Sequence, residues 1–210
     1  MEAIIAALEL VHAEQVGEGR HRDVYRLGDQ AVTILKPQLR KDYKLFSVMF
    51  PAKLYGLLKY GSADLNKTEE ENYRALRAAL PREQHGMLTH IHKTGTFNGA
   101  SYSVSDLVLN ADGSVAQPLC RHGPVRDKGF WEQLASLERT LSERVIPYWE
   151  INEHDVVVQR TENGAQPKLV DYKRMGQRTY VFQPHLLFPK AIVGKIRRKF
   201  LRLKLFYQDE

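Results

Sequence analysis

A two-glycine segment followed by a strand that ends in lysine restricts the fold of this chain more than any other feature. Gly17 and Gly19 separate two predicted strands, and a third strand, Gln30–Leu35, ends at Lys36. Glycines let backbone amides approach a phosphate closely, because no Cβ lies in the way. A lysine closing an apolar strand presents its ammonium group at one face, where it can hold phosphate oxygens. The segment therefore predicts either a phosphate-binding loop or an ordinary glycine-containing hairpin turn.

The remaining pattern predicts an α+β fold with a strand-rich first half. Periodicity predicts strands over 9–16, 23–27, 87–97, 100–109, 156–158 and 168–172, and helices over 66–80, 127–145 and 192–206. We expect Asn66 or Thr68 to cap the first helix and Asp127 the second. Residues 43–60 are apolar and aromatic, and their pattern favours neither helix nor strand.

Composition excludes several classes of protein. The chain has 210 residues, 43% hydrophobic and 27% charged, which is typical of a globular domain. It contains no run of about 18–20 apolar residues, so no membrane-spanning helix is predicted. The single cysteine, Cys120, excludes an internal disulfide framework and a cysteine-rich metal site. Because the N-terminal residues lack the pattern of a secretory signal, we expect a cytoplasmic protein.

The net charge of +6 is concentrated at the C-terminal end. Residues 190–210 hold seven Lys or Arg and two acids, whereas residues 1–189 hold 24 basic and 23 acidic residues. Within 192–206 apolar residues recur at helical intervals, and basic residues occupy the other faces. Such a helix packs its apolar stripe on the domain, lies on an anionic membrane surface, or does both. Nucleic acid is not expected as a partner, because the rest of the chain carries no matching basic surface.

Two carboxylates lie at the ends of predicted paired strands. Asp155 precedes the strand 156–158, and Asp171 lies in the strand 168–172. Carboxylates at the ends of paired strands can converge on one divalent cation, and Mg²⁺ requires hard oxygen ligands. The sequence therefore predicts a magnesium site formed by Asp155 and Asp171.

Together these motifs resemble the protein-kinase-like fold and, more narrowly, the PhoP regulatory network protein YrbL family of small bacterial kinase-like proteins. The resemblance covers about residues 8–176. It rests on Gly17-x-Gly19-x-x-Arg22-x-Val24-Tyr25, Val32–Lys36, Glu69-x-x-x-Tyr73-x-x-Leu76, Tyr102-x-x-x-Asp106, Asp112-Gly113, Glu150-x-x-x-x-Asp155-Val-Val and Leu169-Val-Asp171. It implies a minimal kinase-like fold with a strand-rich N-lobe over 1–105, a truncated helical C-lobe over 106–189 and a basic amphipathic helix over 190–210.

The resemblance also implies which residues would bind the nucleotide. Gly17 and Gly19 would lie over the phosphates, and Lys36 would contact the α- and β-phosphates. Glu69, or its neighbour Glu70, would pair with Lys36. Backbone groups of the hinge, which comprises Ser105, Asp106, Leu107 and Val108, would contact the adenine.

The catalytic and metal-binding roles fall on later residues. By the resemblance, Asp155 and Asp171 would bind Mg²⁺, and Glu150 would act as the catalytic base or orienting group. Glu150 stands where active protein kinases have aspartate, and a displacement of ~1 Å can lower a rate about a hundredfold. Asp171 is followed by Tyr172 and Lys173 rather than Phe-Gly, and only 39 residues follow it. A regulatory activation loop and a protein-substrate platform are therefore not expected.

The expected function is that of a small bacterial kinase that binds ATP and Mg²⁺ and transfers the γ-phosphoryl group to a hydroxyl. The acceptor would be a small molecule, a lipopolysaccharide component or a protein. The alternative is a pseudokinase-like module that binds nucleotide without phosphoryl transfer and associates with the inner membrane through its tail. A third interpretation is an adaptor that binds anions through residues 190–207 alone.

Overall fold

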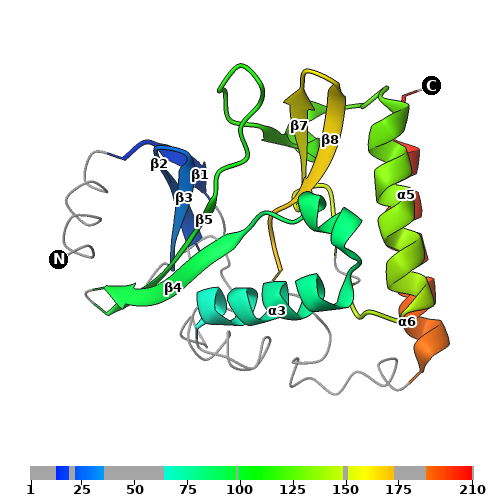
Figure 1. Cartoon of the computed structure of the whole chain (residues 1–210), viewed down its shortest axis with the longest axis horizontal. Coiled ribbons are helices and arrows are strands. Elements are labelled where there is room, and N and C mark those ends of the chain that lie inside the picture. Colours follow the sequence, from blue (N-terminus) through cyan, green and yellow to red (C-terminus); the bar gives the residue numbers. More distant parts are fainter. Residues whose placement is uncertain are drawn as a thin grey trace, which may run out of the picture. The chain divides into compact units, whose positions relative to one another are not determined.

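The computed structural model of the chain describes residues 13–18, 22–35, 64–97, 99–148, 151–172 and 188–209. The chain divides into two compact units (Figure 1). Unit 1 comprises Met1–Glu71, His90–Leu107 and Thr179–Val181, and unit 2 comprises Asn72–Thr89, Val108–Arg178 and Phe182–Glu210. Strands and helices occur in separate runs, and both sheets are antiparallel, so the predicted α+β class is confirmed.

Unit 1 is built on a five-stranded antiparallel sheet. Its strands are β1 (Gln15–Glu18), β2 (Arg22–Leu27), β3 (Gln30–Leu35), β4 (Ile91–Phe97) and β5 (Ala100–Asp106). They lie in the order β1-β2-β3-β5-β4. Ala31 and Val32 on β3 and Val104 on β5 are buried, and Val32 and Val104 are register partners. The core of the sheet therefore lies along its central strand pair.

Helix α3 (Leu65–Ala79) begins one residue earlier than predicted and has a different cap. The Asp64 carboxylate accepts hydrogen bonds from the backbone amides of Asn66 (3.0 Å) and Lys67 (3.2 Å). The prediction of Asn66 or Thr68 as the cap is wrong, because Asn66 uses its side-chain amide to bind Ser101 on β5 at 3.1 Å. The Ser101 hydroxyl in turn donates to Asp64 at 2.6 Å, so the start of α3 is fixed to the sheet of unit 1.

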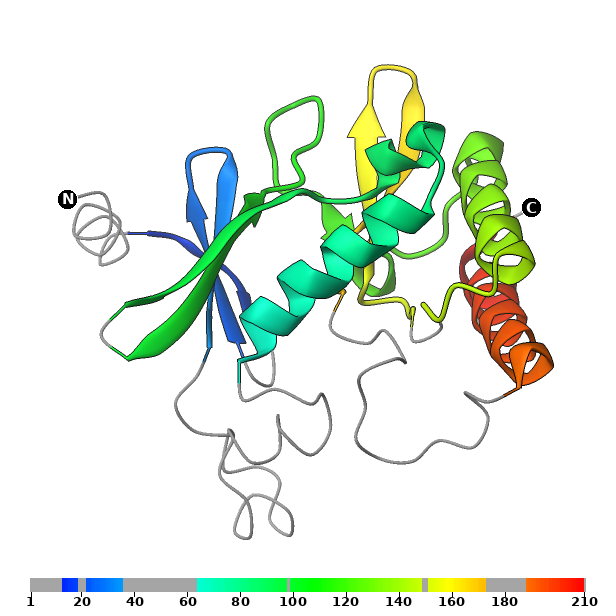
Figure 2. The ribbon, with the colours of Figure 1, turned by 60° about the horizontal axis from the view of Figure 1, so that its bottom comes forward.

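Unit 2 contains a three-stranded antiparallel sheet and the remaining helices. Its elements are η1 (Arg82–Met87), β6 (Gln117–Pro118), α4 (Leu119–His122), α5 (Lys128–Glu143), β7 (Val156–Thr161), β8 (Gly164–Leu169) and α6 (Pro189–Tyr207), and the sheet order is β6-β7-β8. Figures 1 and 2 show α5 and α6 side by side. In the described part of the chain, no helix combines the length and the apolar character that crossing a membrane requires.

The apolar stripes of α5 and α6 form much of the core of unit 2. Helix α5 buries Phe130, Leu134, Leu137 and Leu141, as predicted, and α6 buries Ile192, Ile196, Phe200 and Leu203. Asp127 caps α5 as predicted, accepting from the Gly129 amide at 2.8 Å and the Phe130 amide at 3.3 Å. Its second oxygen accepts from the Ala165 amide on β8 at 2.6 Å, so one carboxylate joins the helix to the β7–β8 hairpin.

The end of α6 is attached to the segment that precedes α5. The amide of Val125 donates to the Tyr207 carbonyl at 2.7 Å, and Val125 forms a parallel bridge with Gln208. The Val125 carbonyl accepts from the indole Nε1 of Trp131 at 2.8 Å. The start of α5 and the end of α6 are thereby fixed around one backbone position.

Several sequence predictions about element bounds differ from the structure, and the strands predicted over 100–109 and 168–172 end at Asp106 and Leu169. The strand predicted over 87–97 begins only at Ile91, because Arg82–Met87 form a 3₁₀ helix whose Gln84 amide binds Ser136 and Thr140 on α5. Helix α5 ends at Glu143, and Val145, predicted within it, has φ of 52°. Strand β1 begins at Gln15, and residues 9–12 of the span predicted over 9–16 lie outside the described residues. The apolar segment 43–60 lies outside the described residues.

Candidate functional site

The predicted site residues divide between the two units. Gly17, Glu69, Ser105, Asp106 and Leu107 belong to unit 1, and Asp155 and Asp171 belong to unit 2. Gly19, Lys36 and Glu150 lie outside the described residues.

Gly17 lies on β1 at a close approach of two strands. It is the register partner of Val24 on β2, next to an irregularity in the pairing of β1 with β2. A Cβ at position 17 would lie 3.3 Å from the Cβ of Val24, which is tighter than ordinary van der Waals contact. Glycine at this position therefore has a packing reason that is independent of any ligand.

Glu69 lies on α3 and forms a largely buried ion pair with Arg22 on β2. The side chains of Arg22 and Glu69 are only 11% and 5% exposed. The same guanidinium donates to the Asn66 Oδ1 at 3.2 Å. The neighbouring Glu70 accepts a hydrogen bond from the Thr94 hydroxyl on β4. The two acids thus contact different strands, and Glu69 is the one whose carboxylate is held near the strand that follows the glycine segment.

Sequence reasoning missed the role of Arg22. In the glycine pattern, Arg22 occupies the position of a third glycine, which this chain lacks. That departure is the signal that could have drawn attention to it, because a long cation there can reach a neighbouring helix. The pairing of Glu69 with Lys36 stays a prediction.

The backbone amides of the predicted hinge are partly engaged within unit 1. The Asp106 amide donates to the His90 carbonyl at 2.9 Å, and the Leu107 amide donates to the Asp29 carbonyl at 2.9 Å. The Asp106 carboxylate lies 2.7 Å from Nε2 of His92. These contacts end β5 and fix the backbone at the boundary of unit 1.

Asp155 and Asp171 leave the same end of the β7–β8 hairpin. Asp155 directly precedes β7, and Asp171 follows the end of β8 by two residues. Val156 and Leu169 are register partners, and the Val170 amide donates to the Asp155 carbonyl at 3.1 Å, which extends the ladder. The paired-strand argument made from sequence therefore holds for the backbone positions of both acids.

Asn152 fixes the turn that carries Asp155. Its amide nitrogen Nδ2 and its backbone amide both donate to Oδ2 of Asp155, and its own carbonyl accepts from the Asp155 amide at 3.0 Å. The Asn152 Oδ1 accepts from the His154 amide at 2.8 Å. Sequence reasoning missed Asn152, although an Asn three residues before an Asp is typical of a turn held by side-chain bonds. The Asp155 carboxylate is thus oriented before any ligand binds.

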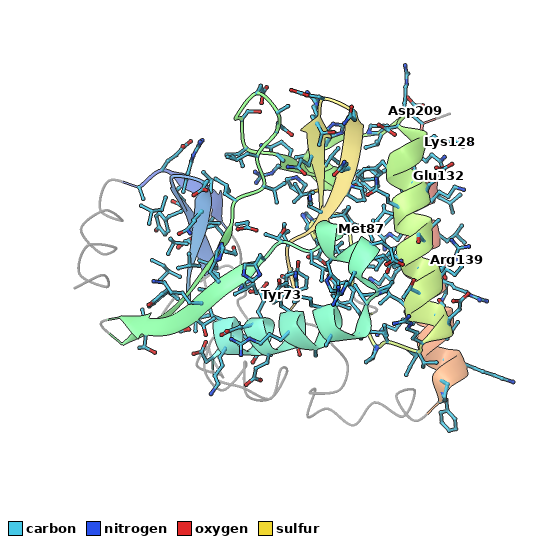
Figure 3. The ribbon with its side chains drawn as sticks, viewed as in Figure 1. Tyr73, Met87, Lys128, Glu132, Arg139 and Asp209 are labelled. Carbon is cyan, nitrogen blue, oxygen red and sulfur yellow. The ribbon has the colours of Figure 1, made fainter. Side chains whose placement is uncertain are left out.

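Buried tyrosines hold the backbone around Asp171. The Tyr148 hydroxyl donates to the Asp171 carbonyl at 2.9 Å. The Tyr172 hydroxyl lies 2.6 Å from the Leu169 carbonyl and 3.2 Å from the Thr89 carbonyl. The Tyr172 carbonyl accepts from the Asn72 side chain on α3 at 2.8 Å. Tyr73, labelled in Figure 3, packs its ring 5.4 Å from the ring of Tyr172.

A cysteine and a histidine are in contact beside the Asp155 turn. Sγ of Cys120 lies 3.1 Å from Nδ1 of His154, and the Cys120 amide donates to the Glu153 carbonyl at 3.1 Å. Burial raises the pKa of the Cys120 thiol above its ordinary value of 9.0. The thiol therefore stays protonated at neutral pH, which makes Cys120 a poor nucleophile.

The donors available for a metal are carboxylate oxygens. In the part of the chain that the structure describes, no three His, Cys, Asp or Glu side chains gather as a metal centre. Mg²⁺ is commonly bound by one or two carboxylates, and it takes its remaining ligands from phosphate oxygens and water. Asp155 and Asp171 fit that donor set by their chemistry.

Comparisons with known proteins give structural likeness and no sequence match. No family model matches the chain, and no curated protein matches it. A double mutant of the Mycobacterium tuberculosis PknI kinase domain has a TM-score of 0.49 at 15% identity, with 90% of this chain and 72% of that chain covered. A crystal structure of the PknI kinase domain without a named mutation has a TM-score of 0.47 at 16% identity, with 90% and 70% covered.

These scores are below 0.5, so the kinase-like assignment rests on element order. The elements follow one another in the order of the kinase pattern. That order is the glycine segment between β1 and β2, the central strand β3, helix α3 with its glutamates, strands β4 and β5, and the β7–β8 hairpin with its two acids. The chain therefore has an α+β fold whose order of elements agrees with the kinase pattern.

Proposed function

We propose that this chain is a small bacterial kinase of the YrbL family that binds Mg²⁺-ATP and transfers the γ-phosphoryl group to a hydroxyl acceptor. The observation that carries the proposal is the emergence of Asp155 and Asp171 from the same end of one hairpin, with the backbone of each fixed by hydrogen bonds. Two preoriented carboxylates suit a metal ion that accompanies a nucleotide, because positioning and charge neutralisation account for most of phosphoryl-transfer catalysis.

The two acids would hold Mg²⁺, which would supply positive charge to neutralise the nucleotide phosphates. Asn152 would keep the Asp155 carboxylate in its orientation, and Tyr148 would keep the backbone of Asp171 in place. In this proposal Asn152 and Tyr148 are positioning residues, because their bonds go to other protein groups rather than to the nucleotide.

In unit 1, Gly17, Gly19 and Lys36 would contact the phosphates. Lys36 follows Leu35, which is the register partner of Arg22. Lys36 itself lies outside the described residues, so its pairing with Glu69 is carried over from the family resemblance. Glu69 would then orient Lys36 toward the α- and β-phosphates.

Adenine recognition would fall on backbone groups of the hinge, Ser105–Val108. The Asp106 and Leu107 amides already donate to protein carbonyls. We therefore assign the adenine contact first to the Leu107 carbonyl, which can accept from the exocyclic amine. The amide engagement predicts a modest preference for adenine over guanine rather than a strict one.

For the transfer step, the acceptor oxygen attacks the γ-phosphorus while the bond to the β,γ-bridging oxygen breaks and ADP leaves. The acceptor proton passes to the Glu150 carboxylate. Lys36 and Asp171 should matter most, because they neutralise charge on the phosphates and the metal.

The test is thermal unfolding of wild type, Lys36→Ala and Asp171→Asn, with and without millimolar Mg²⁺ and ATP. A ligand at about a hundred times its Kd stabilises the fold by ~2.7 kcal/mol, which is several degrees for a domain of this size. We expect a Mg²⁺-dependent rise in wild type that both variants lose. Lys67→Ala and Glu162→Gln are the matched controls, since both residues are exposed and neither belongs to the site.

An equal rise in all five proteins would overturn the nucleotide site. A rise in wild type without release of ADP in the presence of candidate hydroxyl acceptors would instead identify the pseudokinase-like alternative. Formation of ADP that Glu150→Gln abolishes, with the thermal rise retained, would support phosphoryl transfer.

A further inference from the structure

Helix α6 has a second apolar surface that the core does not use. Its inner stripe, Ile192, Ile196, Phe200 and Leu203, is buried in unit 2. Leu201 is 55% exposed, Leu205 is 72% exposed and Phe206 is 69% exposed. Single exposed apolar side chains are common on protein surfaces, but a group of large ones on one helix indicates a binding surface.

The exposed leucines lie on the side of α6 opposite the buried stripe. Leu201 and Leu205 are four residues apart, and at 3.6 residues per turn they are stacked on one face. The same rotation places them roughly 140–180° from the middle of the inner stripe. We call Leu201 and Leu205 the outer ridge.

Basic residues border the outer ridge on both sides. On the helical wheel, Arg198 and Arg202 lie along one side and Arg197 and Lys204 along the other, while Lys190 lies on the same face about three turns nearer the start of the helix. All five are exposed, and Pro189–Tyr207 contains no acidic residue. Arg197 lies 3.7 Å from Glu138 on α5, while the Arg202 guanidinium lies 5.8 Å from the Phe206 ring.

We propose that α6 docks this chain on an anionic phospholipid membrane through the outer ridge. Leu201 and Leu205 enter the boundary between headgroups and acyl chains, and Phe206 follows at its edge. The bordering Arg and Lys side chains extend toward lipid phosphates, as long basic side chains do at membrane interfaces. The surface differs from the one that sequence periodicity suggested, because that stripe is the inner stripe and it is buried.

Charge complementarity selects a lipid surface over other occupants. A second copy of the chain would bring two outer ridges together with five basic residues facing five, and like charges oppose such an interface. A nucleic acid would satisfy the basic residues, but its phosphate backbone offers nothing to two exposed leucines. An anionic bilayer supplies acyl chains for the two leucines and negatively charged headgroups for the basic residues beside them.

The experiment is co-sedimentation of the full chain with large unilamellar vesicles of phosphatidylcholine and phosphatidylglycerol at 3:1, compared with phosphatidylcholine alone. The outer-ridge variant is Leu201→Ser/Leu205→Ser, and the charge variant is Arg198→Gln/Arg202→Gln. Lys67→Gln/Arg82→Gln removes the same charge from exposed positions outside α6 and serves as the matched control. Thermal unfolding establishes that each variant is folded.

We expect wild type to bind anionic vesicles and to bind neutral vesicles at least tenfold more weakly. The outer-ridge variant should bind anionic vesicles at least tenfold more weakly than wild type. The charge variant should lose about 25-fold, about fivefold for each charge removed near the surface. The control variant should stay within about twofold of wild type.

The proposal is overturned if wild type does not bind anionic vesicles, or if the outer-ridge variant binds as wild type does. If the outer-ridge variant binds as wild type does, the basic residues of α6 alone are attracted to the vesicles, as they would be to any polyanion. Loss of a wild-type dimer in the outer-ridge variant, without vesicle binding by wild type, would identify a second copy as the occupant. The inference is independent of the nucleotide site, since Lys36→Ala should retain vesicle binding and the outer-ridge variant should retain the ATP-dependent rise.

Discussion

The guanidinium of Arg22 on β2 and the carboxylate of Glu69 on α3 form an ion pair within unit 1, although 47 residues separate them. Asn66 accepts a second hydrogen bond from Arg22 at 3.2 Å. The strand that leaves the glycine segment is therefore fixed to the helix by a pair of charges that have little contact with water. Removing one member would leave the other charge poorly solvated.

Arg22→Met should lower the free energy of unfolding by about 3–5 kcal/mol, because it removes the guanidinium that pairs with the largely buried Glu69 carboxylate. Urea denaturation measures the change. Arg26→Met on the same strand is the control, since Arg26 bonds only a backbone carbonyl among the contacts described, and it should cost less than ~1 kcal/mol. In Arg22→Met/Glu69→Met, most of the loss should return, and a double variant no more stable than Arg22→Met would contradict the pairing.

Asn152→Ala should weaken Mg²⁺ binding without removing a metal ligand. Asn152 orients Asp155 by two hydrogen bonds, and loss of such outer contacts typically lowers metal affinity about 10–100-fold. The measurement is the Mg²⁺ concentration that gives half of the ATP-dependent thermal rise. Asn163→Ala, in the turn between β7 and β8, should leave that concentration unchanged, and equal effects in both variants would exclude a positioning role for Asn152.

Tyr172→Phe should destabilise unit 2 by about 1–3 kcal/mol, because the buried carbonyls of Leu169 and Thr89 lose a hydroxyl partner. Chemical denaturation followed by circular dichroism measures the loss. Tyr207→Phe, at the less buried end of α6, is the matched control, and we expect a change below ~0.5 kcal/mol there. An unchanged midpoint in Tyr172→Phe would argue that water satisfies both carbonyls.

Asp127→Asn should destabilise the fold by about 1–2 kcal/mol at neutral pH, because asparagine keeps one capping oxygen but places an amide donor opposite the Ala165 amide. Hydrogen bonds from Ala165, Phe130 and Gly129 amides lower the pKa of Asp127 below its ordinary value of 3.8. A folded-state pKa that is lowered stabilises the protein above the unfolded value, and this stabilisation is lost as pH falls through the folded value. The difference between wild type and variant should therefore be constant from pH 5 to pH 8 and shrink below about pH 3.8.

Cys120 should react slowly with iodoacetamide at pH 7.5, and its rate should still be rising at pH 9.0, because burial raises the pKa of its thiol above that value. Mass spectrometry of the alkylated chain gives the rate at each pH. Unfolding in urea should accelerate the reaction at pH 7.5. A rate that levels off by pH 8 in the folded protein would mean that His154 holds a thiolate instead.

Sequence patterns correctly predicted those elements that are determined by interactions within one segment of the chain. Asp127 and the apolar spacing from Phe130 to Leu141 defined α5 correctly, since capping and a 3.6-residue period are properties of one segment. Asn66 was assigned the wrong role because its side chain serves a contact with Ser101, 35 residues away. The sequence alone does not show whether the side-chain amide of an asparagine caps its own helix with the oxygen or donates from the nitrogen to a distant residue.

In the candidate site, the sequence predicted the backbone positions of the two acids but missed the residues that hold them in place. Strand pairing alone placed Asp155 and Asp171 at one end of a hairpin, because antiparallel neighbours bring the start of one strand beside the end of the other. Asn152, Tyr148 and Tyr172 were missed, since each acts through a bond to a backbone or a turn that has no periodic signature. The positions of Lys36 and Glu150 stay predictions.

The pairing of α5 with α6 also has a consequence for how the chain is synthesised. Helix α5 ends at Glu143 and its partner begins only at Pro189. At a translation rate of about 5–20 residues per second, roughly 2–9 seconds pass after α5 is complete before synthesis of α6 begins. During that interval the nascent chain exposes Leu134, Leu137 and Leu141, which makes it a substrate for ribosome-associated chaperones. Slower translation between the two helices should lower the yield of native protein, and co-expressed chaperone should restore it.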